Sequence, residues 1–125
     1  MRYLLDTDSC IYLFADSHPH LSRRVTEART GEIAVSSVTF AELAMGSAQR
    51  KPPSRELLSG FADEVPILAF DKAAAWAYAT LPFRRGRFDR LLAAHVLSLD
   101  ATLITNNERD FADLPGLKVE NWTLP

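Results

Sequence analysis

The sequence predicts an α/β fold in which a mostly parallel sheet is covered by helices on both faces. Short apolar runs, each long enough for one buried strand, alternate along the chain with longer segments of helical character. Most of these runs are continuously apolar, which is typical of strands buried on both faces. The chain has 125 residues, 47% hydrophobic and 24% charged, so we expect one folded domain over residues 1–125.

The first half of the chain supplies two strands and three helices of this pattern. Pro19 interrupts the helical character between the first two helices, and Gly31 ends the second helix. The expected elements are a strand over 3–5, helices over 8–15 and 21–29, a strand over 33–35 and a helix over 39–48.

The second half repeats the alternation after Pro52-Pro53, which stops any helix. Ser54 and Asp71 stand where they can cap the two helices that follow. The expected elements are a helix from Ser54 to 61, a strand over 65–69, a helix from Asp71 to 79, a helix over 89–99, a strand over 102–105 and a short strand over 117–119.

Charge and cysteine content exclude several classes of protein. Fourteen Lys and Arg against sixteen Asp and Glu give a net charge of -2, which argues against a uniformly basic surface but not against a local basic patch. Cys10 is the only cysteine, so an intrachain disulfide and an all-cysteine zinc site are excluded. No apolar run approaches the roughly 18 residues of a membrane span. Asp6 comes too early for a signal peptide, and we expect a cytoplasmic protein.

Four acidic residues stand at the ends of the predicted strands or at the starts of helices. Asp6 follows the first strand, Glu42 lies after the second, Asp89 opens a helix, and Asp110 follows the strand over 102–105. Ligands of parallel sheets bind beyond the carboxyl ends of the strands, so we expect these acids to meet there. Carboxylates that meet raise one another's pKa unless a cation such as Mg²⁺ compensates them. Such a site suits phosphoryl chemistry.

Each of these acids taken alone also has a structural interpretation. Asp6 and Asp89 are possible helix N-caps, and Thr39 with Glu42 has the spacing of a capping box. Asp110 alone is typical of a solvated surface acid. Only the joint placement of all four at one edge of the sheet favours chemistry over capping.

Four segments, taken in order, resemble the motifs of PIN-domain ribonucleases, and among them the VapC toxins of bacterial toxin–antitoxin pairs. The resemblance covers essentially the whole chain and implies a three-layer α/β/α PIN-like domain. The matching segments are Leu4 to Thr7, Ile33 to Leu43 with Gly46 behind it, Phe88 to His95, and Leu103 to Phe111 followed by Pro115-Gly116-Leu117 and Glu120-Asn121-Trp122.

The resemblance implies a role for each matching acid. Asp6 and Asp89 would be the main ligands of Mg²⁺ or Mn²⁺, and Glu42 would complete the cluster directly or through metal-bound water. Asp110 would be the fourth acid, close to Asn107, which occupies a position that is acidic in some relatives.

The same resemblance implies a reaction and partners. Thr7 and Thr105 would hold carboxylates or waters around the metal. A metal-activated water would attack an RNA phosphodiester and leave a 5′-phosphate, and the RNA would be a tRNA, with initiator tRNA the leading candidate. A cognate VapB-like antitoxin would insert a basic side chain into the acidic pocket. The chain would form homodimers, and heterotetramers or larger assemblies with that antitoxin.

A basic stretch surrounds Asp89 and has two interpretations. Arg84, Arg85, Arg87 and Arg90 either form a solvated basic loop or contact the phosphates of bound RNA. We expect no catalytic role for the remaining candidates: His95 would lie on a helix face and Cys10 in the core.

Asp8 departs from the family pattern, because relatives usually carry Asn or Ser there. It either widens the metal site or caps the first helix, and we favour the cap. The Asp6-x-Asp8 spacing also resembles haloacid-dehalogenase-like phosphatases, in which Asp6 would be the nucleophile and Asp8 the acid/base. The chain is short for that family. A non-catalytic binding module is the third alternative.

Overall fold

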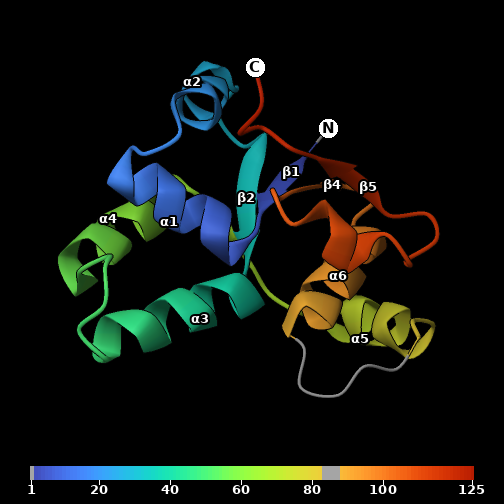
Figure 1. Ribbon diagram of the computed structural model, residues 1–125. Helices are drawn as coiled ribbons and strands as arrows, with labels where there is room; N and C mark the ends of the chain where they lie inside the picture. Colours follow the sequence, from blue (N-terminus) through green and yellow to red (C-terminus); the bar gives the residue numbers. More distant parts are fainter. Residues whose placement is uncertain (1, 83–87) are drawn as a thin grey trace.

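The computed structural model describes residues 2–82 and 88–125, which form a five-stranded parallel sheet between two layers of helices (Figure 1). The strand order is β3-β2-β1-β4-β5, and every neighbouring pair is parallel. The predicted α/β architecture is confirmed. The strands are β1 (Tyr3–Leu5), β2 (Ile33–Ser36), β3 (Ile67–Leu68), β4 (Thr102–Ile104) and β5 (Lys118–Glu120).

Helices α1 to α4 cover one face of the sheet, and α5, α6 and the 3-10 helix η1 cover the other (Figure 1). None of the helices within the described residues is long and apolar enough to cross a membrane. The helices are α1 (Thr7–Ala15), α2 (Pro19–Glu27), α3 (Ser37–Ala48), α4 (Arg55–Glu64), α5 (Lys72–Ala79), α6 (Phe88–Ser98) and η1 (Glu108–Phe111).

Two cores lie on the two faces of the sheet because successive side chains of a strand point in opposite directions. Leu5 and Ile104 pack with the α1 to α4 layer, whereas their neighbours Leu4 and Leu103 pack with α6 and η1. All four side chains are essentially inaccessible to solvent. The continuously apolar runs of the sequence are therefore explained by burial on both faces.

The starts of two predicted helices are wrong for local reasons, and one short helix was missed. Pro19 does not interrupt a helix but opens α2, because the first turn needs no proline N–H. The N-cap of α3 is Ser36, whose hydroxyl accepts from the N–H of Val38, so Thr39 lies inside the helix and the predicted capping box with Glu42 does not form. Helix η1 was not predicted from the sequence.

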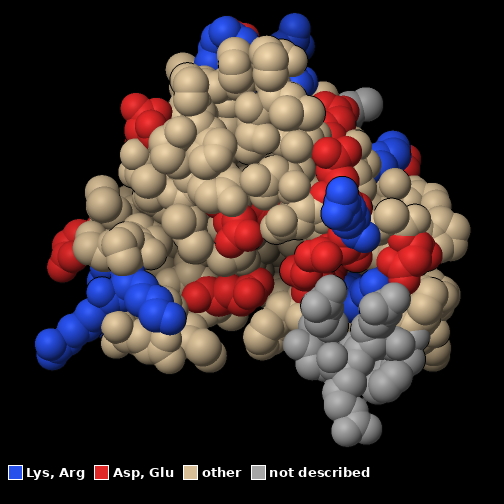
Figure 2. All heavy atoms as spheres, in the orientation of Figure 1, with Lys and Arg blue, Asp and Glu red and all other residues tan. Residues whose placement is uncertain are grey.

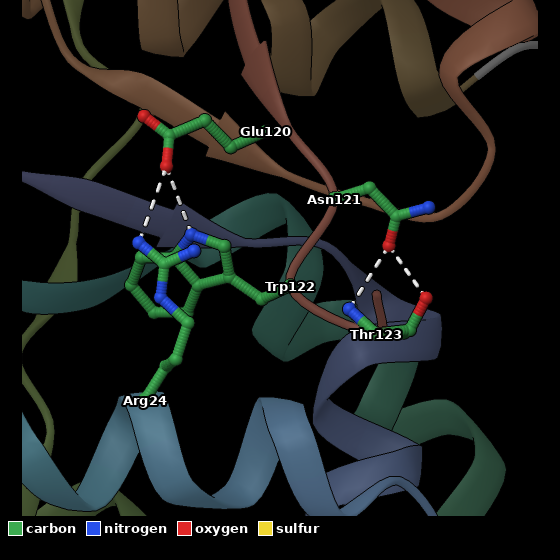
Figure 3. A network of polar contacts seen from close by, with 5 residues as sticks. All are labelled: Arg24, Glu120, Asn121, Trp122 and Thr123. Carbon is green, nitrogen blue, oxygen red and sulfur yellow. Dashed lines mark hydrogen bonds and ion pairs between the residues drawn. The ribbon is translucent and has the colours of Figure 1, made fainter. Parts of the chain in front are cut away.

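The C-terminal segment closes the α2 side of the molecule through one aromatic residue (Figure 3). Trp122 is buried and packs on Tyr3, with 4.9 Å between ring centroids. The guanidinium carbon of Arg24, on α2, lies 4.4 Å from the Trp122 ring centroid. Glu120 accepts a hydrogen bond of 2.9 Å from the indole N–H and pairs with Arg24 at 3.6 Å. The segment after β5 is thus fixed to both β1 and α2.

Candidate active site

The carboxyl ends of β1, β2 and β4 meet at Asp6. Leu5 is in register with Ile104, and the N–H of Asp6 donates to the Ile104 carbonyl at 3.1 Å. Figure 2 shows acidic side chains on both sides of the hollow in the middle of this face, where α1, α3 and α6 begin in Figure 1. Parallel winding therefore gathers acids at one edge of the sheet, as the sequence predicts.

Asp6 is buried and serves as the N-cap of α1. Only 6% of its surface is exposed, and its carboxylate accepts from the N–H of Ser9 at 2.8 Å. Burial raises the pKa of Asp6, and hydrogen bonds from Ser9 and Thr105 oppose that rise without cancelling it. The predicted cap is therefore present, and the hydrogen bond from Ser9 fixes the orientation of this buried carboxylate.

Glu42 lies on α3 and is held by Thr7 on α1. The Thr7 hydroxyl donates to the Glu42 carboxylate at 2.8 Å. Partial burial raises the pKa of Glu42, and repulsion from Asp89, Asp8 and Asp6 raises it further. The charges of three predicted acids therefore act on one another at this edge.

Asp8 joins this cluster, and the expectation that it caps the first helix is wrong. It lies in the first turn of α1, which Asp6 caps, and its charge acts on both Asp6 and Glu42. One carboxylate oxygen of Asp8 accepts from the side-chain amide of Asn107 at 3.1 Å. The Asp6-x-Asp8 spacing was the available signal, since one helical turn keeps both carboxylates near the strand end.

Asp110 is exposed on η1, in an open polar depression of about 320 Å³ formed by residues 106–110. The amide of Asn107 ties this segment to Asp8, and the backbone N–H of Asn107 donates to Thr105 at 3.0 Å. The structure thus connects the loop carrying Asp110 to the strand-end acids through Asn107.

The oxygen-rich donor set fits a hard divalent cation that keeps several waters. Among the residues that the structure describes, no three His, Cys, Asp or Glu side chains are grouped closely enough to hold one ion together. Mg²⁺ needs only one or two carboxylates, with water filling the other positions. Asp6 and Asp89 as direct ligands, with Glu42 reached through water, would satisfy that requirement.

The structure contradicts the prediction that Arg90 contacts RNA phosphates. Arg90 is 2% exposed, and its Nη2 donates to both carboxylate oxygens of Asp113, at 3.0 and 3.1 Å. Arg90 shares the buried face of α6 with Ala93 and Ala94, three and four positions further on, whose small side chains leave room for it. Arg84, Arg85 and Arg87 lie outside the described residues.

His95 and Cys10 are both buried, with 1% and 0% of their surfaces exposed. The Nδ1 atom of His95 lies 2.7 Å from the hydroxyl of Ser36, and burial lowers the pKa of the ring. Cys10 is fully buried, and burial raises the pKa of its thiol. The predicted core position of Cys10 is confirmed, and His95 lies on the buried face of α6.

The fold and this acidic edge define a class of proteins, and the sequence comparison identifies it. The pattern described as PIN domain matches residues 3–117, so the chain belongs to the PIN-domain family. It is 32% identical to a tRNA(fMet)-specific endonuclease VapC of Shigella flexneri, with 98% of this chain and 99% of the relative covered. It is also 32% identical to a ribonuclease VapC2 of Rickettsia felis, with 98% of each covered. Within the family the chain is therefore a member of the VapC group.

Solved structures agree with this assignment. The fold matches that of VapBC from Salmonella typhimurium bound to DNA, with a TM-score of 0.85, 28% identity and 98% of each chain covered. It matches VapBC2 from Rickettsia felis bound to a promoter fragment with a TM-score of 0.81, 29% identity and 98% and 99% coverage. The resemblance seen in the motifs is confirmed, and the haloacid-dehalogenase-like alternative is abandoned.

Proposed function

We propose that this chain is the endoribonuclease toxin of a VapBC-type pair and that it hydrolyses RNA phosphodiesters with Mg²⁺, or with Mn²⁺ in its place. The observation that carries the proposal is the meeting of Asp6, Glu42 and Asp89 at the carboxyl ends of parallel strands, with Thr7 bonded to Glu42. Membership of the VapC group supports the reaction, because relatives carry the names ribonuclease and endonuclease.

The chemistry divides between the bound cation and the side chains around it. A bound Mg²⁺ would supply charge for the phosphorane oxygens and lower the pKa of an attacking water. Asp6 and Asp89 would hold the cation, and Thr105 and Ser9 keep the Asp6 carboxylate in place. The pKa of Glu42 is raised by its surroundings, which suits it to accept a proton from the attacking water. Thr7 fixes the direction in which Glu42 points.

Substrate and partner follow from the relatives. Two relatives are named tRNA(fMet)-specific endonucleases, which supports a tRNA substrate, with initiator tRNA as the first to test. Two of the similar solved structures are VapBC complexes on DNA, which supports a VapB-like antitoxin and an assembly larger than a homodimer. The acidic edge attracts a basic side chain of that antitoxin.

The decisive experiment compares the wild-type chain with Asp6→Asn, and uses Asp63→Asn on the exposed face of α4 as the matched control. Expression of wild type and Asp63→Asn in bacteria should arrest growth and cut tRNA at discrete sites, whereas Asp6→Asn should do neither. Purified wild type should cleave tRNA with Mg²⁺ and stop when EDTA is added. Harmless wild-type expression, or cleavage that survives Asp6→Asn, would favour a non-catalytic binding module or a different site.

A further inference from the structure

A cavity with about 300 Å³ of open volume lies directly beside the acidic edge and is not used by the mechanism above. Thr7 and Glu42 form the wall that it shares with the candidate active site. Met45, Gly46 and Phe88 also line the cavity. The cavity is therefore continuous with the place where a phosphodiester would be cut.

The lining of this cavity is unusual for a surface that only water contacts. Met45 is 60% exposed and Phe88 is 52% exposed, so two large apolar side chains stand open to solvent next to carboxylates. Gln49 and Lys51 add an amide and a cation to the same lining. An aromatic ring, a polarisable thioether, an amide and an ammonium group together match a flat, polar-edged molecule that carries a phosphate.

We propose that this cavity binds one unpaired nucleobase of the RNA, in a nucleotide next to the phosphodiester that is cut. The base stacks on Phe88 and packs on Met45, while Gln49 hydrogen-bonds to its edge. Lys51 lies where it can contact a neighbouring phosphate. The inference rests on the proposed function and adds to it the requirement that the RNA be single-stranded at the cut.

The position of the cavity favours a nucleobase over a peptide side chain. Phe88 directly precedes Asp89, and Glu42 belongs to both the cavity wall and the acidic cluster. A base in this cavity would keep its own phosphate beside the carboxylates, because base and phosphate belong to the same nucleotide. An antitoxin peptide can use both the apolar lining and the adjoining acids, but it carries no phosphate that this position would place at the site of cleavage.

The test uses short RNA substrates in which single nucleotides around the cut lack their base but keep the sugar and phosphate. Because base–aromatic stacking is worth roughly 1–3 kcal/mol per base, wild type should cleave one such RNA about 5- to 150-fold more slowly than the intact RNA. Phe88→Ala should reduce that ratio towards one, and Phe88→Tyr should restore it. Leu57→Ala, which removes an equally exposed apolar side chain from α4, should keep the full ratio.

A second variant tests the cavity without touching Phe88. A Cβ added at Gly46 meets only the Cβ of Lys51, at 4.0 Å, so Gly46→Leu places its side chain in open space and suits a helix. Gly46→Leu should also lose the discrimination between intact and abasic RNA. If the ratio of cleavage rates for intact and abasic RNA stays at its wild-type value in both variants, the proposal is overturned. Weaker inhibition by an antitoxin in the same variants would then indicate that the cavity binds a peptide instead. Failure of wild type to cleave any RNA would instead overturn the proposed function.

Discussion

Two clusters of charged side chains in this molecule are built in opposite ways. At the C-terminal segment, Arg24 and Glu120 carry opposite charges, and both also contact Trp122 (Figure 3). At the acidic edge, Asp6 and Glu42 carry the same charge, and burial and mutual repulsion raise the pKa of Glu42. The charges of the first cluster attract one another and stabilise the fold. The charges of the second cluster repel one another, so the rest of the fold must keep them together.

The difference indicates which cluster awaits a ligand. A group of charges that is already compensated has little to gain from another ion. Buried carboxylates that repel one another are stabilised by a bound cation, because the cation offsets their repulsion. The same cation also makes the site chemically reactive. Removing single charges from compensated pairs and from the acidic edge, and measuring the free energy of unfolding, tests this difference.

The Arg90–Asp113 pair should show the largest effect on stability, because it combines a buried guanidinium with a carboxylate that is 41% exposed. Asp113→Ala leaves the guanidinium of Arg90 buried without its carboxylate, which costs about 3–5 kcal/mol for a fully buried charge. Arg90→Met leaves Asp113 at a surface where its side chain is 41% exposed, so it should cost clearly less. Urea unfolding of both variants measures the asymmetry.

The double variant Arg90→Met with Asp113→Ala is the control for this pair. It should recover much of the stability that Asp113→Ala loses, because the uncompensated charge is then gone. Within the described residues, the Nε and Nη1 atoms of Arg90 are buried without a hydrogen-bond partner, so its charge depends heavily on Asp113. Equal losses in the two single variants would show that the guanidinium charge is not what Asp113 compensates.

The acidic edge should respond to pH in the direction opposite to that of a salt bridge. Because burial raises the pKa of Asp6 above its unfolded value, the protonated form favours folding, and the stability of the metal-free protein should fall as pH rises through the folded pKa. Asp6→Asn, which keeps an oxygen for the cap, should therefore flatten this dependence and stabilise the metal-free protein at pH 7. Chemical unfolding in EDTA between pH 3.5 and 7 measures it.

Added Mg²⁺ tests whether the buried charge of Asp6 is what destabilises the metal-free protein. Mg²⁺ should raise the thermal midpoint of wild type at pH 7, because it binds the folded state and offsets the buried charge. Asp6→Asn should lose that increase, and Asp63→Asn should keep it. A wild-type protein that becomes less stable on acidification over this range, in the absence of metal, would contradict the assignment of Asp6 as a destabilising buried carboxylate.

The sequence predicted the parts of this arrangement that depend on the period of apolar residues. The alternation of apolar runs with helices determines a parallel sheet, and the sheet brings Asp6 to the same edge as the start of α3. Side-chain direction was not predictable in the same way. Arg90 was expected in solvent because its neighbours are charged, yet its place on the helix turns it inward with Ala93 and Ala94.

The same limit applies to caps. Several residues near a helix start can act as its cap, and the choice depends on where the strand before it ends. Ser36 caps α3 because β2 continues directly into that helix, and Asp6 caps α1 because β1 ends one residue earlier. The sequence predicted a cap at Thr39 for the third helix and offered Asp8 as well as Asp6 for the first, and only the backbone path decides which residue caps each helix.

The smallest effect is expected at Arg24, where the compensated cluster meets solvent. The Arg24 and Glu120 side chains are 46% and 41% exposed, so their ion pair should contribute only about 0–1 kcal/mol. Stacking of the guanidinium on Trp122 adds about 0.5–1 kcal/mol at such a site. Arg24→Met, which keeps a long apolar side chain over the indole, should therefore lower the unfolding free energy by less than Asp113→Ala does. A loss at Arg24 as large as that at Asp113 would mean that the charge on α2, and not the buried Trp122, fixes the C-terminal segment.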